Sequence, residues 1–487
     1  MTRHKYISKL AGVLVLSLGL GSCTGSFLDT TPSNKVPTEN AFDSFSSTEN
    51  AVNGLYDLMS SYGYYGGTMF FYGDMKGDDI QSSYNSGRDC NNCYLFNHRA
   101  NNLGAGYLWG RPYYIIRQGW NIVSAIDNNK IQDATTEDLA YLKGEALAVI
   151  ALCHFDLTRC FGYPYTKDNG ASWGAPIVER AIGLDENPER KTVAEDYNFI
   201  IKTLNDAIPL MTTDKMNGRM NQYAARMLLS RVYLYMGNEE EAYNVSSKLI
   251  EELKTGNEYK LYTNEEYLKS WNLDEKFGTE SLFEIANASD DNEGRNSLAY
   301  LMHPYGYEEM FLTESFMELM NKDKNDVRYQ LIGEVTYNKA TRYWLKKWPG
   351  SDDTTPASYN NYVVFRLSEL YLIAAEAALT LTGEKKDKGL EYLNEIVSRG
   401  NPDNNVDMDE YTLERVLEER RKELVGEGHR FFDVLRNGMK ITRTGNLHME
   451  NAVKEIDWNY EKCVLPIPED QFVFNPDMEQ NPGYSKF

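Results

Sequence analysis

Apolar side chains recur with helical spacing along most of the chain, and this periodicity restricts the fold more than any other feature. Within residues 221–237 the apolar positions fall at i, i+3, i+4, i+7 and i+11, as Ala225, Leu228, Leu229, Val232 and Met236. The same pattern returns in 365–383 and 388–400, with short Gly-containing turns between segments. Small Ala residues flanked by Tyr and Leu are typical of tetratricopeptide-like hairpins. We therefore predict an all-α, mainly helical scaffold of degenerate hairpins with long inserted loops and little β-structure.

The chain divides into four parts by composition. These are a lipoprotein signal peptide (1–22), a polar, Pro-containing tether (23–40), an N-terminal helical part (41–256) and a C-terminal part (257–487) that forms one compact unit with the part before it. Residues 61–107 and 257–360 are rich in Gly, Asn, Asp and Tyr, and we expect long structured loops there. Loops on a rigid helical frame are where binding residues usually lie.

The N-terminus has the pattern of an exported lipoprotein. A basic stretch, "MTRHKYISK", precedes the eleven apolar residues "LAGVLVLSLGL", which are too few to span a bilayer as a helix but suit a signal peptide. The small residues "LGS" then lead into Cys23, which resembles a bacterial lipobox. The thiol of Cys23 is the expected lipid attachment point, and the alternative is an ordinary signal peptide with an incidental cysteine. No later stretch is apolar enough to cross a membrane, so we expect contact with the membrane through lipid only.

Charge and aromatic content narrow the classes of ligand. The formal net charge is -22, and loss of Arg3, Lys5 and Lys9 with the signal peptide would make it -25. A surface this acidic repels phosphate backbones, so nucleic acid is not an expected partner. The chain holds 35 Tyr against 19 Phe. Tyr combines an apolar ring with a polar tip and suits wet carbohydrate or peptide surfaces, although packing between helices accounts for many of these rings.

Known catalytic and metal motifs are missing from the sequence. The six His form no H-E-x-x-H pattern, and neither a G-x-S-x-G elbow nor a Walker A loop occurs. Cys90 and Cys93 have C-x-x-C spacing without a second pair to complete a zinc site, so a local disulfide and two free thiols both remain open. We expect no metal, no cofactor and no enzymatic activity. With 72 acidic residues, a glycosidase-type carboxylate pair stays as the alternative.

A dense charged segment near the C-terminus, "EERRKELVGEGHRFFDVLR" (418–436), combines many acids and bases with apolar residues. We interpret it as a structural lock, in which Arg–Glu forks across the glycine turn fix the angle between two short helices. The catalytic alternative has only His429 as a nearby base.

Several segments together resemble one family, the SusD/RagB-type outer-membrane nutrient-binding lipoproteins of Bacteroidota. The charged segment is similar to that family's C-terminal signature, and "VLPIPEDQFVFNPDMEQNPGY" resembles its closing segment. "FRLSELYLIAAEA", "GEALAVIALCHFDLTRCFGYP" and "CTGSFLDTTP" are similar to earlier parts, so the likeness runs from Cys23 to Tyr484. The residues that match the signature are Glu419, Arg420, Glu423, Glu427, Gly428, Arg430, Asp433 and Arg436.

The resemblance implies a non-catalytic lipoprotein at the outer membrane, facing the cell exterior. It implies partnership with a SusC-like TonB-dependent transporter, to which the protein delivers an oligosaccharide or, in a minority of members, a peptide. The resemblance also implies that the signature is structural, which agrees with the lock interpretation. A surface hydrolase and a purely structural adhesin are the other functions that the sequence leaves open.

Ligand-binding residues are not part of the family pattern, so physical chemistry alone selects candidates. Sugar faces stack on Trp and Tyr rings, while Asp, Asn and Arg hydrogen-bond hydroxyl groups. Two loop regions and three tryptophans have this mixture; packing or plain solvent exposure is the alternative for each. The candidates are Asp79, Tyr84 and Arg88 in the first loop, Asn296, Tyr305 and Tyr307 in the second, and Trp271, Trp344 and Trp348 as further platforms.

Overall fold

The computed structural model describes residues 42–487 apart from 83, 85, 102, 184, 338, 339, 353 and 354. The chain is mainly helical, with 48% helix and 10% strand, which confirms the fold class expected from the periodicity. The predicted signal peptide, Cys23 and the predicted tether fall outside the described residues.

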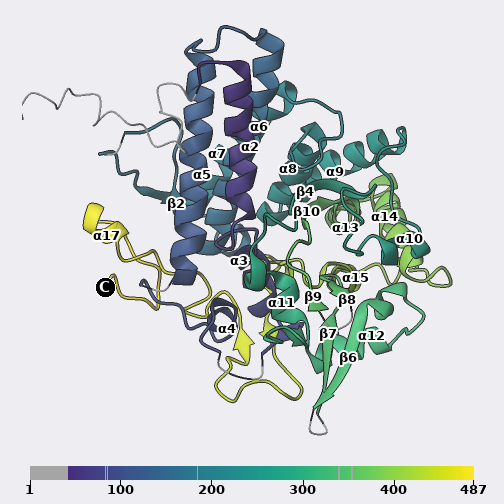
Figure 1. The fold of residues 1–487 in the computed structure, drawn as a ribbon. Coiled ribbons are helices and arrows are strands. Elements are labelled where there is room, and N and C mark those ends of the chain that lie inside the picture. Colours follow the sequence, from purple (N-terminus) through teal and green to yellow (C-terminus); the bar gives the residue numbers. More distant parts are fainter. Residues whose placement is uncertain are drawn as a thin grey trace, which may run out of the picture.

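The secondary-structure elements follow one another from α2 to α17 (Figure 1). The α-helices are α2 (Phe45–Ser60), α3 (Thr68–Met75), α4 (Asp89–Tyr94), α5 (Leu103–Asp127), α6 (Thr136–Phe161), α7 (Val193–Ala207), α8 (Gln222–Met236), α9 (Glu239–Lys254), α10 (Asn264–Lys269), α11 (Leu298–Met302), α12 (Glu314–Asn321), α13 (Leu367–Ala378), α14 (Glu384–Gly400), α15 (Leu413–Leu424), α16 (Arg430–Arg436) and α17 (Gln471–Phe474). The strands are β1 (Ile80–Gln81), β2 (Trp173–Pro176), β3 (Arg190–Thr192), β4 (Ser281–Ile285), β5 (Phe311–Leu312), β6 (Ile332–Tyr337), β7 (Ala340–Leu345), β8 (Gly350–Asp352), β9 (Thr355–Pro356), β10 (Tyr362–Arg366), β11 (Ile441–Thr442) and β12 (Glu455–Ile456).

The helices pack as successive hairpins. Helix α5 packs against α6, α6 against α7 and α8 against α9, while α13 pairs with α14. In Figure 1, α2, α5 and α6 run side by side as a tall bundle, and α8, α9, α13 and α14 extend to its right. Every residue of α13 is buried, and this helix contacts α8 and α9 as well as α14 and α15. Residues on both sides of position 257 therefore share one core.

Local signals explain where these helices begin and end. Thr135 and Asp138 form a capping box at the start of α6, and Gly162 follows its last residue. Asn221 caps α8, and Gly237 ends it with a positive φ of 68°, which only Gly adopts without strain. Ser44 caps α2, because its side chain accepts a hydrogen bond from the Ser47 amide.

The segment 61–107 is more ordered than its composition suggests. It contains α3, α4 and the first turn of α5, where the sequence predicts loops. All eight residues of α3 are buried. An amphipathic pattern cannot appear in a helix that is covered on every side, which is why periodicity misses it.

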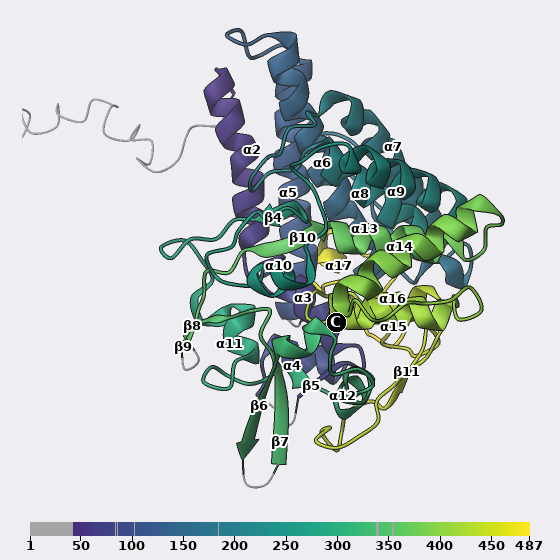
Figure 2. The ribbon, with the colours of Figure 1, turned by 90° about the vertical axis from the view of Figure 1, so that its right-hand side faces the viewer.

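The inserted region 257–360 supplies most of the β-structure. Strands β1, β5, β7 and β6 form a four-stranded sheet in that order, and β4 pairs with β10 in a separate ribbon. The β6–β7 hairpin projects from the bottom of the molecule in the view of Figure 2. Gly333 of β6 lies opposite Trp344 of β7.

Candidate functional site

Two candidate loops, more than two hundred residues apart in sequence, meet in the structure. The Tyr84 hydroxyl donates a hydrogen bond to the Tyr307 carbonyl oxygen at 2.7 Å. The Arg88 guanidinium lies over the Tyr307 ring, 3.6 Å from its centre. Such cation–π contacts hold a guanidinium flat on an aromatic face. The structure therefore brings Tyr84, Arg88 and Tyr307 together.

A buried carboxylate, Glu309, holds these loops in place. Its oxygens lie 2.7 Å from Arg88 Nε and 3.0 Å from Ser86 Oγ, and Cys90 Sγ lies 2.9 Å away. Burial, together with the nearby Glu309 charge, raises the pKa of the Cys90 thiol well above its ordinary value. Cys90 and Cys93 are both buried free thiols, not a disulfide. No local sequence pattern points to Glu309, because its partners lie more than two hundred residues away along the chain.

Aromatic rings continue the surface on the second loop. The ring of His303 lies 5.9 Å from that of Tyr305 and 4.5 Å from that of Trp344. Tyr305 is 66% exposed, and Tyr84 is 42% exposed. We call Tyr84, Arg88, Tyr305, Tyr307 and Trp344 the loop site. These side chains supply aromatic rings and one guanidinium, and Tyr84 and Tyr305 among them are exposed.

Two other candidates are buried, and for them the expectation of a ligand-facing side chain does not hold. Trp348 is 2% exposed; its ring packs against Phe70 and Tyr362, and its Nε1 donates to the Gly426 carbonyl oxygen at 3.2 Å. It is a core side chain. Asp79 is 1% exposed, and its carboxylate accepts a hydrogen bond from Arg421 Nε at 2.9 Å.

The last two candidates lie outside the loop site. Trp271 is half-buried; its ring is 6.1 Å from that of Tyr267, and Lys347 Nζ lies 4.8 Å from its centre. Asn296 is exposed at the end of a short 3-10 turn, just before α11. Within the described residues, neither Trp271 nor Asn296 makes a ring, ionic or hydrogen-bond contact with the five loop-site side chains.

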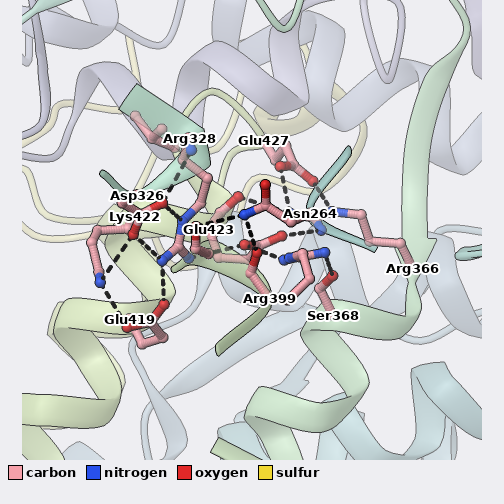
Figure 3. Close-up of polar contacts among 12 residues, drawn as sticks. Asn264, Asp326, Arg328, Arg366, Ser368, Arg399, Glu419, Lys422, Glu423 and Glu427 are labelled. Atoms are coloured by element: carbon pink, nitrogen blue, oxygen red, sulfur yellow. Dashed lines mark hydrogen bonds and ion pairs between the residues drawn. The ribbon is translucent and has the colours of Figure 1, made fainter. Parts of the chain in front are cut away.

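The charged C-terminal segment forms a buried ionic network (Figure 3). Glu423 is fully buried, and its carboxylate lies 2.5 Å from Arg366, 2.6 Å from Arg399 and 3.0 Å from Arg328. Burial alone would raise the pKa of Glu423, but the charges of Arg399, Arg366 and Arg328 hold it well below its ordinary value. Glu423 is therefore an ionised carboxylate at the centre of three arginines from different elements.

The neighbouring acids extend this network. Glu427 lies 2.6 Å from Lys347 and 2.7 Å from Arg366, and Glu419 lies 2.5 Å from Arg328. The sequence suggested Arg–Glu forks within the segment. These glutamates instead pair mainly with cations from the 3-10 turn at 327–331, from the stretch after β7 and from β10.

The ion pair that does cross the glycine turn joins an arginine to an aspartate, not to a glutamate. Arg420 Nε and Nη2 donate to the two oxygens of Asp433 at 2.8 and 3.0 Å, linking α15 to α16. Arg436 Nη1 and Nη2 donate to the two carboxylate oxygens of Glu376, on α13, at 2.6 and 2.7 Å.

The same segment is joined to the N-terminal part of the chain. Arg430 Nε donates to Asp78 at 2.6 Å, and the Gly428 amide donates to Asp74 at 3.0 Å. Glu423 and Asp433 are buried among packed elements and Arg430 is only partly exposed, which supports a structural role for this segment rather than a place in an open cleft.

Metal sites and membrane-spanning helices are two features that bear on function, and neither occurs in the part of the chain that the structure describes. Across the described residues, no group of three or more His, Cys, Asp or Glu side chains is arranged to hold a metal ion. Within the same part of the chain, no helix has both the length and the apolar character that crossing a bilayer requires.

The fold defines a mainly helical protein with tetratricopeptide-like helical packing. The chain belongs to the SusD family, whose model matches residues 192–484. A second family model, described as starch-binding associating with outer membrane, matches residues 26–234. SusD family proteins are non-catalytic glycan-binding proteins.

Three of the similar proteins come from Bacteroides species. A SusD superfamily protein from Bacteroides vulgatus is 57% identical, with a TM-score of 0.89, over 91% of this chain and 100% of its own. A protein from the same species, described as sugar binding, is 40% identical with a TM-score of 0.83, over 91% and 100% of the two chains. A SusD-like protein from Bacteroides ovatus is 24% identical over 88% of this chain and 82% of its own.

Proposed function

We propose that this protein captures an oligosaccharide at the loop site and delivers it to a SusC-like TonB-dependent transporter. In this proposal, residues 1–22 are removed, lipid on Cys23 anchors the protein to the outer membrane, and the body faces the cell exterior. Membership of the SusD family and the likeness to a protein described as sugar binding support this role.

The observation that carries the proposal is the convergence of the two loops. Tyr84 and Arg88 both contact Tyr307, and the exposed Tyr305 lies two residues before Tyr307 on the second loop. Exposed rings stack on the apolar faces of sugars, and a guanidinium supplies several directed donors to hydroxyl groups.

The experiment is calorimetry and affinity electrophoresis of the mature protein against plant, algal and mucin polysaccharides and their oligosaccharides. Wild type should bind at least one glycan without degrading it, and Tyr305→Ala should weaken that binding about tenfold, or about 1.4 kcal/mol. Trp173→Ala is the matched control, since Trp173 is 50% exposed on β2 and is not part of the loop site. Release of shorter sugars would favour a hydrolase, and binding of peptides alone would favour a peptide carrier.

The anchor and the partner need separate tests. Cys23→Ala should move the protein from the outer-membrane fraction to the soluble fraction without changing glycan affinity. Gentle detergent extraction of the wild type should co-purify a large outer-membrane barrel. Its absence from repeated extracts would contradict the delivery role and leave the glycan-binding role intact.

A further inference from the structure

A large groove lies away from the loop site, between α5 and α17. Its volume is about 370 Å³, within the range of ligand pockets in proteins. Its walls come from α5, the segment 176–188 and residues 471–478. Figure 1 shows α5, β2 and α17 together on the left of the molecule. We call it the α5–α17 groove.

Helix α5 gives this groove one continuous wall. Gly110, Tyr114 and Arg117 all line it, and their spacing of four and three residues places them on one helix face. A Cβ built on Gly110 would meet no heavy atom within 4 Å, so the helix is open to the groove at that turn. The wall from residue 110 to residue 117 is about 10 Å long, which suits two linked sugar rings.

The other walls are fixed to the body of the protein. Trp120 Nε1 donates to the Val178 carbonyl oxygen at 2.7 Å, and the Tyr113 hydroxyl donates to that of Pro176 at 2.8 Å. Arg190, which is buried, donates to the Glu479 carbonyl oxygen at 2.8 Å and holds the C-terminal wall. The groove is therefore formed before any ligand arrives, which reduces the entropy lost on binding.

The groove combines exposed rings with unengaged polar side chains. Tyr114 on α5 is 48% exposed, and Phe474 on α17 is 68% exposed. The side chains of Arg117 and Asn475 have no hydrogen-bond or ionic partner in the described part of the chain. The carboxylate of Glu186 is already bound to Arg180.

This lining fits one class of ligand. Ring faces with free amide and guanidinium donors suit a neutral saccharide, which presents both apolar faces and hydroxyl groups. A stable protein partner would need roughly 600–1,000 Å² of surface on each side. A groove enclosed by three walls offers far less contact area than that.

A chain of contacts joins the groove to the loop site. The Tyr62 hydroxyl lies 3.3 Å from Asp89, the residue after Arg88. The ring of Tyr62 also lies 6.0 Å from that of Tyr107, one helical turn before Gly110 on α5. The two sites are thus connected through the first turns of one helix.

We propose that the α5–α17 groove is a second saccharide subsite that holds a distal part of a glycan bound at the loop site. The inference depends on the glycan-binding role proposed above. Because the second contact is intramolecular once the first has formed, the groove raises the affinity for long chains without changing that for short ones.

The test compares polymers with short fragments on the mature chain. Gly110→Leu fills the groove at a position with open space, and Leu forms helices better than Gly. Phe474→Ala removes the ring from the opposite wall, and Val473→Ala is its matched control, since Val473 is 69% exposed on the same helix and does not line the groove. Laminarin, amylopectin, xyloglucan and pectic galactan are the polymers, and their tetrasaccharides are the short ligands.

Gly110→Leu and Phe474→Ala should each lower the affinity for the bound polymer about tenfold and leave that for its tetrasaccharide unchanged. Val473→Ala should change neither. Unchanged polymer affinity in both groove variants, or equal loss for polymer and tetrasaccharide, overturns the second subsite while leaving the loop site in place. A wild type that retains no polymer overturns the proposed function and this inference together. Loss of the co-purifying barrel with polymer affinity unchanged would also overturn it, by assigning the groove to a protein.

Discussion

The guanidinium of Arg88 lies 3.6 Å from the ring centre of Tyr307 while its Nε lies 2.7 Å from the buried Glu309 carboxylate. One side chain of the first loop thus engages a ring and a charge of the second. Both contacts tie the first loop to the second, so the arrangement of the loop site depends on this arginine.

Replacement of Arg88 by Ala should therefore weaken glycan binding about tenfold or more, because it frees the two loops and leaves Glu309 without its cation. Calorimetry with the wild-type ligand measures the effect. Arg226→Ala on α8, which removes the ion pair with Glu252 far along the chain, is the control and should bind normally. Equal affinity of Arg88→Ala and wild type would show that the loops do not need this contact.

Glu423→Gln should destabilise the protein by about 3–5 kcal/mol, because three arginines would be left around a neutral side chain in a buried site. Glu418→Gln, on the same helix, breaks only an exposed pair with Lys322 and should cost no more than about 1 kcal/mol. Urea unfolding of both variants measures the difference. Similar costs for the two would contradict a central role for the Glu423 network.

Asp196 should make stability fall as pH rises. Burial raises the pKa of Asp196 from 3.8 to about 8, although the Ala175 amide and the Thr158 hydroxyl donate to its carboxylate. The folded state keeps a proton that the unfolded chain releases above about pH 4, so this stabilising contribution is complete below pH 4 and is lost toward pH 8. The expected slope is about 1.4 kcal/mol for each pH unit in that window.

Asp196→Asn removes that titration. Unfolding free energies of the wild type and the variant, measured between pH 4 and 8, should converge at low pH and separate as pH rises, with Asn the more stable. Parallel curves would mean that Asp196 is already ionised in the folded protein.

Gly428 and Gly383 give a matched pair for backbone packing. Both have positive φ, 80° and 59°, so a Cβ at either position strains the backbone by about 1–2 kcal/mol. Only at Gly428 does the Cβ also meet backbone, 3.0 Å from Phe70 Cα, while at Gly383 it meets nothing within 4 Å. Gly428→Ala should therefore lower the melting temperature clearly more than Gly383→Ala. Equal shifts would mean that α3 moves aside at little cost.

Local signals predicted much of the helical frame. The spacing of Leu228, Val232 and Met236 depends only on neighbours within a few turns, so α8 could be identified from the sequence. Gly426 and Gly428 likewise marked the break between α15 and α16, where both adopt positive φ. The sequence did not predict helix α3, because a fully buried helix has no polar face and shows no amphipathic pattern.

The candidate site depends on contacts that local patterns do not encode. Trp344 and Trp348 occur four residues apart in similar surroundings, yet only Trp348 is a core side chain, since Phe70 and Tyr362 cover it. Tyr84 and Tyr307 meet through a hydrogen bond across more than two hundred residues. Residue type alone selected the candidate ligand-binding side chains. The tertiary arrangement decides which of these side chains lie in contact with one another.

The close backbone approach of α3 to the glycine turn has a consequence for biosynthesis. A Cβ on Gly73 would lie 1.9 Å from the Gly428 carbonyl oxygen. The main chain of α3 and that of the glycine turn therefore touch with no side chain between them. A nascent polypeptide lacks this contact until its C-terminal segment has been made, and until then Tyr72 also lacks the rings of Phe431 and Phe432. Completion of this part of the core therefore has to follow translation of residues 418–436.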